Sequence, residues 1–391
     1  MAKYRTAIIA CGNIARVHAR AWLNVPGTPV EIGAIADSHP DALREFGEFH
    51  NVPAERRYRD YREMLEKERP DFVDVCSWHG MHAEMVVATA ARRPRAILCQ
   101  KPMALSMGDA DRMVVACERN GVKLFIAFQR PHHATWLKAR DLIREGAIGK
   151  VIQVVCDDGG NLLNTNSHNI RLALFLMGEP RAEWVMGAVE RTTERMERGF
   201  PAEDAALGVV GCDNGATILI MGALKLAHRL GQGARVIGTE GMMELDTGRP
   251  PADQWRTDGD QWQPEGSSAK YNDEWGSVRY LNATTGGWKS VEAKWHDAWA
   301  HQAWEAYEWA EGRLKDPISD ARNGYAAQEI MMALYESARR KQRIELPLRT
   351  RVNPLAYAVE HGELPVEWPG PYEVRARIVR GEGMTWGDGG Q

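Results

Sequence analysis

The chain has 391 residues, 44% of them hydrophobic and 26% charged, which fits a globular protein with two domains. Its formal net charge of −4 at pH 7 offers no basic field to a nucleic acid, and no apolar run is long enough to span a membrane. We therefore expect small-molecule ligands, with no nucleic acid and no membrane as partners. The six cysteines are scattered without a Cys-x-x-Cys pair, which favours reduced thiols and a cytoplasmic location.

The first candidate motif follows an apolar strand predicted from Ala7 to Ala10. The segment Cys11-Gly12-Asn13-Ile14-Ala15 then opens a helical pattern that continues to Trp22. A strand, a tight turn and a helix N-terminus in this order can hold a pyrophosphate through backbone N–H groups. Ala10 and Ala15 stand at the first and third positions of the glycine fingerprint, so the pattern alone does not exclude an ordinary strand–helix turn.

A second strand, Val30 to Ala36, ends in Asp37, which lies 25 residues after Gly12. A carboxylate near this spacing can bind the adenosine ribose, and it would repel a 2′-phosphate, so NAD is favoured over NADP. The alternative is that Asp37 caps the helix predicted to start at Pro40.

Strands and helices continue to alternate as far as Phe128. Helices are predicted at Pro40 to Phe49, Tyr61 to Glu68 and Ser106 to Asn120, and strands at Phe72 to Cys76, Ala96 to Cys99 and Lys123 to Phe128. This alternation predicts an α/β fold with a doubly wound parallel sheet, which binds ligands at the carboxyl ends of its strands. Lys101, in Gln100-Lys101-Pro102, follows one of these ends.

Five segments in the same order resemble the Gfo/Idh/MocA family, which includes glucose-fructose oxidoreductase and inositol dehydrogenase. They are the Cys11 to Ala15 turn; Ser77 to His82, similar to Thr-Pro-Asn-x-x-His; Gln100-Lys101-Pro102, similar to Glu-Lys-Pro; Gly159 to His168, similar to Gly-Gly-x-Leu-x-Asp-x-Gly-x-His; and the predicted hairpin Gly238-Thr239-Glu240-Gly241. The resemblance runs to about Pro347.

The resemblance implies a Rossmann domain at 1–128, a substrate-binding and oligomerisation domain with a large, mostly antiparallel sheet at 129–348, and an extension at 349–391. It also implies a homo-oligomer, and a nicotinamide in the cleft between the domains. By resemblance the catalytic residues are Lys101, His168 and Asn164, and the substrate-binding residues are Lys101, Arg130, Asn164 and His168. The cofactor-binding residues would be Gly12, Asn13, Ile14, Asp37, Ser77, Trp78, His79, His82, Gln100, Lys101 and Gln129.

Oxidation of a carbinol needs a base near the hydroxyl and a cation or donor that stabilises the developing alkoxide. We assign His168 as the base and Lys101 as the stabiliser, with the reverse assignment open. Two acidic residues of the family are missing, because Gln100 replaces a glutamate and Asn164 an aspartate, and Arg171 stands where the family often has a further aspartate. These changes predict a more positive site and suggest an anionic substrate.

Other candidate residues carry weaker signals. His79 and His82 have no acidic or cysteine partner in sequence, so no metal site is predicted. Substrate contact at His132 and His133 is left open. Beyond Val151 short strands replace the alternation, and Asp246 to Gly287 is predicted to be a loop whose tryptophans, Trp255, Trp262 and Trp275, with Trp288 beyond it, serve packing, an interface or sugar stacking.

The predicted activity is hydride transfer between NAD and a hydroxyl of a sugar, sugar acid or cyclitol. The alternative, also drawn from the family, is an NAD-dependent glycosidase that oxidises a ring transiently, eliminates the aglycone and reduces the ring again. A non-enzymatic role in NAD binding is a third reading.

Overall fold

The computed structural model describes residues 4–25, 27, 30–158, 160–222, 233–246, 277–291, 297–364 and 366–373. Contacts divide the chain into two compact units, Met1–His132 with His296–Gln328, and His133–Trp295 with Glu329–Gln391. The second unit contains segments from both of the expected ranges 129–348 and 349–391, and part of the range 129–348 belongs to the first unit. The expected domain boundaries stay a prediction.

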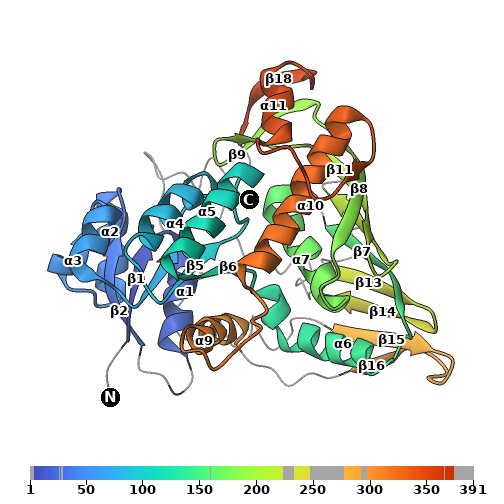
Figure 1. Ribbon diagram of the computed structural model, residues 1–391, viewed down its shortest axis with the longest axis horizontal. Helices are drawn as coiled ribbons and strands as arrows, with labels where there is room; N and C mark the ends of the chain where they lie inside the picture. Colours follow the sequence, from blue (N-terminus) through green and yellow to red (C-terminus); the bar gives the residue numbers. More distant parts are fainter. Residues whose placement is uncertain are drawn as a thin grey trace, which may run out of the picture. The chain divides into compact units, whose positions relative to one another are not determined.

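The first unit is built on a six-stranded parallel sheet with the strand order β3-β2-β1-β4-β5-β6 (Figure 1). The strands are β1 (Tyr4–Ile9), β2 (Val30–Ala36), β3 (Arg57–Tyr58), β4 (Phe72–Val75), β5 (Ala96–Gln100) and β6 (Lys123–Ala127). The strand order reverses between β1 and β4, because β2 and β3 follow on one side of β1, and β5 and β6 follow on the far side of β4. Doubly wound sheets bind ligands at this point. The doubly wound fold predicted from the sequence is confirmed.

Helices connect these strands, and several begin at capping residues that the sequence supplies. They are α1 (Asn13–Leu23), α2 (Pro40–Phe49), α3 (Tyr61–Glu68), α4 (His82–Ala90) and α5 (Met107–Asn120), with short 3-10 turns η1 (Ala54–Arg56), η2 (His79–Met81) and η3 (Arg130–His132). The Asp60 side chain caps α3 and the Ser106 hydroxyl caps α5. Helix α9 (Ala298–Ala310) returns to this unit and packs on α1.

The second unit is built on a nine-stranded sheet with the order β16-β15-β14-β13-β7-β12-β11-β8-β17. Its strands are β7 (Val151–Asp158), β8 (Ala182–Glu190), β11 (Ala205–Cys212), β12 (Thr217–Gly222), β13 (Gly233–Gly238), β14 (Gly241–Asp246), β15 (Ser277–Asn282), β16 (Lys289–Val291) and β17 (Ile344–Glu345). Only the β7–β12 pairing is parallel. The large, mostly antiparallel sheet is therefore also confirmed, and β13 and β14 form the predicted hairpin.

Helices α6 (Ala134–Arg144) and α7 (Ser167–Leu176) contact each other, α7 packs on β7 and β12, and α6 packs on β15, so both lie on one face of this sheet. The 20-residue helix α10 (Ala321–Arg340) belongs to the first unit up to Gln328 and to the second from Glu329. Its Leu334 lies against Gly187 of β8 and Gly208 of β11, where an added Cβ would come within 3 Å of the leucine side chain.

Two sequence interpretations need correction or completion. The predicted loop from Asp246 to Gly287 contains strand β15, and its tryptophans at 255, 262 and 275 lie outside the described residues. The C-terminal extension, which the sequence left uninterpreted, contains α11 (Pro354–Glu360) and β18 (Trp368–Glu373). Strand β18 pairs with β9 (Thr193–Glu197), which also pairs with β10 (Phe200–Pro201), in a third sheet.

Two further findings bear on the chain's surroundings. Across the described ranges, none of the helices combines the length and the apolar character that crossing a bilayer requires. All six cysteines are free and buried, as expected for reduced thiols.

Candidate active site

The glycine turn leaves room for a ligand at the N-terminus of α1. Gly12 is the N-cap residue, with φ −80° and ψ −174°, and as a glycine it has no side chain to cap the first turn. A Cβ placed on Gly12 would meet no heavy atom within 4 Å. The turn therefore combines open space with helical N–H groups, as the binding of a pyrophosphate requires.

Ala10 occupies the first glycine position of the fingerprint in a left-handed conformation, with φ 71°. Its N–H donates to the carbonyl oxygen of Ala36 at 2.8 Å, which ties the turn to the end of β2. The missing glycine has thus not changed the conformation that the turn needs, although alanine is strained there.

Asp37 lies beside this turn and is not the N-cap of α2. Its Oδ2 accepts a hydrogen bond from the Cys11 N–H at 2.7 Å, and its Oδ1 accepts one from the His39 N–H at 2.7 Å. The N-cap residue of α2 is His39. The capping interpretation is therefore wrong, whereas ribose binding by Asp37 stays a prediction.

The loops after β4 and β5 are joined by a fully buried histidine. Nδ1 of His82 lies 2.9 Å from the Pro102 carbonyl oxygen, and its Nε2 lies 2.9 Å from the Ser77 carbonyl oxygen. The Lys101–Pro102 peptide bond is cis. Because β1, β4 and β5 are neighbouring parallel strands, the predicted residues Gly12, Ser77 and Lys101 lie at the same edge of the sheet. In the segment after β4, Trp78 is half-buried and His79 is buried.

Behind Lys101 runs a chain of buried hydrogen bonds that the sequence analysis missed. The Lys101 N–H donates to Oε1 of Gln100 at 3.0 Å, and Nε2 of Gln100 lies 2.7 Å from Nε2 of His18. Nδ1 of His18 lies 2.8 Å from Asp74, which also accepts a hydrogen bond from Trp22 Nε1 at 2.9 Å. The Gln100 side chain thus points to His18, and not to the ammonium group of Lys101.

His18 and Asp74, together with Cys76, are also the one group of potential metal ligands among the described residues, with donor atoms within 4.8 Å of one another. Hydrogen bonds account for this cluster, because Trp22 and His18 bond to the Asp74 carboxylate and Gln100 bonds to His18. Burial raises the pKa of the Cys76 thiol well above its usual range, which opposes the thiolate that a metal would need.

The sequence contains a signal for this series of buried hydrogen bonds. Asp74 is a carboxylate in the middle of the apolar run Phe72 to Cys76, and a charge in a buried strand needs partners. His18 and Trp22 are four residues apart in α1 and therefore lie on one face of the helix. The sequence does not reveal that this face meets Asp74.

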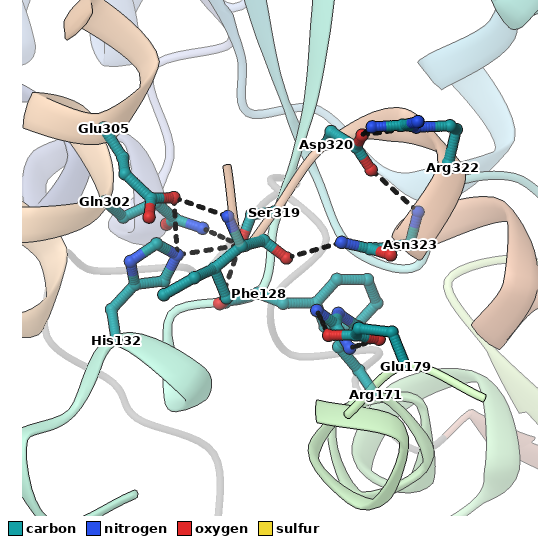
Figure 2. Close-up of polar contacts among 11 residues, drawn as sticks. Phe128, His132, Arg171, Glu179, Gln302, Glu305, Ser319, Asp320, Arg322 and Asn323 are labelled. Carbon is teal, nitrogen blue, oxygen red and sulfur yellow. Dashed lines mark hydrogen bonds and ion pairs between the residues drawn. The ribbon is translucent and has the colours of Figure 1, made fainter. Parts of the chain in front are cut away.

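The segment after β6 leads into a second buried cluster, shown in Figure 2. Nε2 of His132 lies 2.8 Å from the Ser319 hydroxyl. Nδ1 of His132 lies 3.2 Å from Nδ1 of His301. His132 is fully buried, so its contacts are structural, whereas Arg130 is half-buried. Oε1 of Gln129 is buried and has no hydrogen-bond partner within the described part of the chain, which leaves an acceptor for a ligand.

In the second unit, Asn164 and His168 lie on consecutive helical turns. The π-helical turn η4 (Leu162–Asn166) carries Asn164 and leads directly into α7, where His168 is the second residue. The Asn164 N–H donates to Oδ1 of Asn161 at 2.8 Å, and its carbonyl oxygen accepts a hydrogen bond from the Ser167 hydroxyl. Asn164 is half-buried and His168 is 6% exposed. Single π turns are frequent at functional sites.

Two buried carboxylates hold this turn, and neither was predicted. Oε1 of Glu203 accepts a hydrogen bond from the Leu162 N–H at 2.6 Å, and its Oε2 accepts one from the Tyr335 hydroxyl at 2.7 Å. Glu197 accepts a hydrogen bond from the Asn161 side chain. Burial raises the pKa of Glu203, and these hydrogen bonds oppose the shift. The two carboxylates come from β9 and the segment before β11.

Arg171 does not supply the positive charge that the sequence analysis attributed to it. Its side chain is fully buried and forms a two-pronged ion pair with Glu179, at 2.8 Å and 2.6 Å (Figure 2). The expectation that Arg171 makes the site more positive is therefore wrong, because Glu179 balances its charge locally.

Two family models match this chain. One describes an oxidoreductase family with an NAD-binding Rossmann fold and matches residues 4–128. The other describes the C-terminal alpha/beta domain of an oxidoreductase family and matches residues 140–346.

Individual relatives agree with these models. The chain is 27% identical over 259 residues to myo-inositol 2-dehydrogenase of Thermotoga maritima, covering 63% of this chain and 76% of the relative. It is 30% identical over 229 residues to D-apiose dehydrogenase of Paraburkholderia graminis, covering 56% and 60%. Among solved structures, aldose-aldose oxidoreductase of Caulobacter crescentus, complexed with glycerol, matches with a TM-score of 0.71 at 22% identity, over 88% of this chain and 100% of that one.

Proposed function

Because the chain belongs to the Gfo/Idh/MocA oxidoreductase family, we propose that it transfers hydride between NAD and a hydroxyl group of a sugar, sugar acid or cyclitol. The observation that carries this proposal is the shared sheet edge, where the open turn at Gly12 and the lysine after β5 lie at the ends of neighbouring strands. The names of the relatives, an inositol and an apiose dehydrogenase, support a carbohydrate-like substrate.

The residues present fit a dinucleotide. Gly12 leaves space for close approach, the first turn of α1 offers N–H groups, and Gln129 presents a buried acceptor. Bound NAD would supply the hydride acceptor. Asp37, placed at the turn by its bond to Cys11, would accept a hydrogen bond from the ribose and disfavour a 2′-phosphate, so we propose NAD as the preferred cofactor.

Lys101 would bind the reacting oxygen through its ammonium group and stabilise the alkoxide that develops as hydride leaves. His168 would accept the hydroxyl proton, as an imidazole can near neutral pH. Asn164 would orient the substrate or His168 through its neutral amide. The reverse division of labour, with Lys101 as the base, is the alternative that kinetics must separate.

The outer face of the nine-stranded sheet supports a second proposal, that two copies of the chain associate through it. Met186, Val209, Leu219 and Val155 pair across β8, β11, β12 and β7 and form one apolar row. Their neighbours Val185, Val210, Ile218 and Val154 are fully buried on the opposite face. Met186 is 58% exposed, and an uncovered apolar row of this kind is typical of an interface.

The activity is tested first with a panel of sugars, sugar acids, cyclitols and glycosides, incubated with the protein and NAD while NADH and aglycone are followed together. Three variants then test the roles of Lys101 and Gly12. With the substrate found, Lys101→Met should lower kcat by about 10²–10⁴-fold, and Lys101→Arg should restore part of it, because one charge-stabilising donor is worth that much. Gly12→Ala should leave the melting temperature unchanged, since its Cβ meets no atom, but should weaken NAD binding at least about tenfold.

Full activity of Lys101→Met would reject the catalytic role of the lysine. Unchanged NAD binding by Gly12→Ala would reject the turn as the pyrophosphate site. Release of aglycone without NADH would replace the dehydrogenase by the glycosidase.

A further inference from the structure

We propose that His18 and Asp74 are positioning residues for Lys101, which act through the amide of Gln100 with His18 neutral and its proton on Nδ1. This inference rests on the proposed role of Lys101. All four residues lie in the first unit: His18 on α1, Asp74 on β4, Gln100 at the end of β5, and Lys101 directly after it.

The first step concerns Asp74, the hydrogen-bond acceptor at the buried end of this series of bonds. Asp74 is fully buried and acts as an acceptor, since Trp22 Nε1 donates to it at 2.9 Å. Nδ1 of His18 lies 3.0 Å and 2.8 Å from its two carboxylate oxygens. Nδ1 must therefore carry a hydrogen, because a bare ring nitrogen would face a carboxylate with no proton between them.

The second step starts from the other end. The peptide N–H of Lys101 can only donate, so the atom of Gln100 that it meets at 3.0 Å must be the carbonyl oxygen. The NH₂ group of Gln100 then faces Nε2 of His18 at 2.7 Å, and Nε2 must accept. A flipped amide would set NH₂ against the Lys101 N–H, so only neutral His18 satisfies every group.

The third step concerns what this chain of bonds achieves. Gln100 is 6% exposed and His18 1%, and the Trp299 ring of α9 packs on His18 with ring centres 5.3 Å apart. Its hydrogen bonds therefore fix the amide of Gln100 between the buried helix α1 and the first peptide after β5. The Lys101 side chain starts from that peptide, so the position of its ammonium group depends on these bonds. A displacement of a catalytic group by about 1 Å can cost about 100-fold in rate.

The fourth step explains the glutamine. A glutamate, as in the family's Glu-Lys-Pro, has no N–H to donate, so it could bond to His18 only if Nε2 were protonated. Glutamate with an imidazolium and glutamine with a neutral imidazole carry the same net charge. The charge lost when glutamine replaces glutamate at position 100 is thus offset by the charge that His18 loses. Gln100 therefore gives no more reason than Arg171 to expect a more positive site.

The tautomer is tested directly by ¹⁵N NMR of the full-length protein labelled in histidine, with His18 assigned from its absence in His18→Gln. The wild type should show a neutral ring protonated at Nδ1, and Gln100→Glu should show an imidazolium. Among the described residues, Asp74 of β4 and Cys76, which directly follows β4, are the titratable groups whose ligand atoms lie within 4.8 Å of His18. An imidazolium in the wild type, or a neutral ring in Gln100→Glu, would overturn the proposal.

The positioning role is tested by kinetics. Gln100→Leu removes both hydrogen bonds and should lower kcat by about 10–100-fold, because the peptide from which the Lys101 side chain starts is then no longer held in place. Gln100→Glu should restore kcat to within about threefold. If Gln100→Leu does not fold, the shorter amide of Gln100→Asn serves, with a loss in the same direction.

A double-mutant cycle separates this inference from the proposed function. In a Lys101→Met background, Gln100→Leu should cause no further loss of kcat, because it acts through Lys101. An undiminished loss there would show that Gln100 acts on the fold or on another group, and would overturn the positioning role. Full activity of Lys101→Met alone would instead reject the proposed function, while the NMR result still decides the state of His18.

Discussion

Ala10 gives the most direct test of the turn, because it holds a left-handed conformation at the position where the fingerprint has its first glycine. A Cβ in this region costs about 1–2 kcal/mol. Replacement by glycine removes that strain but gives the unfolded chain more freedom, which costs about 0.4–1 kcal/mol. Ala10→Gly should therefore raise the free energy of unfolding by about 0.5–1 kcal/mol.

Ala15, at the third glycine position, is the matched control. It is fully buried inside α1, so Ala15→Gly loses helix propensity worth about 1 kcal/mol and a buried methyl group worth about 0.8 kcal/mol. The same substitution five residues away should thus act in the opposite direction. Calorimetry should show a melting temperature about 1–4 °C higher for Ala10→Gly, and a lower one for Ala15→Gly. A loss of stability in Ala10→Gly would refute the claim of strain.

Four further outcomes follow from described contacts. Burial, together with the charge of Arg16, lowers the pKa of His50 to about 4, so the unfolded chain binds this proton first and stability should fall as the pH drops from about 6.5 to about 4; His50→Gln should flatten that part of the melting profile. Glu179→Gln should cost about 1–3 kcal/mol in urea unfolding, more than Arg171→Met, because it leaves a buried guanidinium unbalanced. Asp37→Asn keeps an acceptor for Cys11 and should shift the ratio of the NAD and NADP Kd values toward NADP, whereas an unchanged ratio would reject the ribose contact. Met186→Asp should lower the mass measured by sedimentation if copies associate through the sheet, while Lys289→Asp, at its charged end, should leave it unchanged.

The order of elements in the first unit could be predicted because each signal is local. Pro40–Phe49 and Tyr61–Glu68 are helices with the predicted bounds. Capping residues and apolar periodicity lie within a few positions of the helix that they specify. The sheet edge that carries Gly12 and Lys101 follows from the same local pattern, since parallel strands end on one side.

The contacts that hold the site could not be predicted in this way. His18 and Asp74 are 56 positions apart, and Leu162 and Glu203 are 41 apart. Strand β15 was missed because it follows a stretch rich in glycine and aspartate, and β18 because Pro369 and Gly370 interrupt it. Pairing across such distances depends on the whole fold, which one sequence does not display.

The errors about charge have one cause. Arg171 and Gln100 were each compared with the residue that the family has at that position, as if the neighbours were fixed. In the structure Glu179 balances Arg171. By the tautomer proposed above, a neutral His18 faces the neutral amide of Gln100. Net charge at a buried position is a property of the bonded group, because an unbalanced charge there costs several kcal/mol.

Ala10 and Gln100 then illustrate two ways in which a motif changes while its geometry stays. At Ala10 the backbone keeps its left-handed conformation and the cost appears as strain, so glycine should increase stability. At Gln100 the bonds are kept by moving a proton on His18, so glutamate should change the histidine's protonation and leave activity almost intact. Asn164 lies four residues before His168, the proposed base, so it is the position where we expect the missing acid to matter most. If Asn164→Asp raised kcat while Gln100→Glu did not, the reaction would depend on the acid next to His168 and not on the one before Lys101.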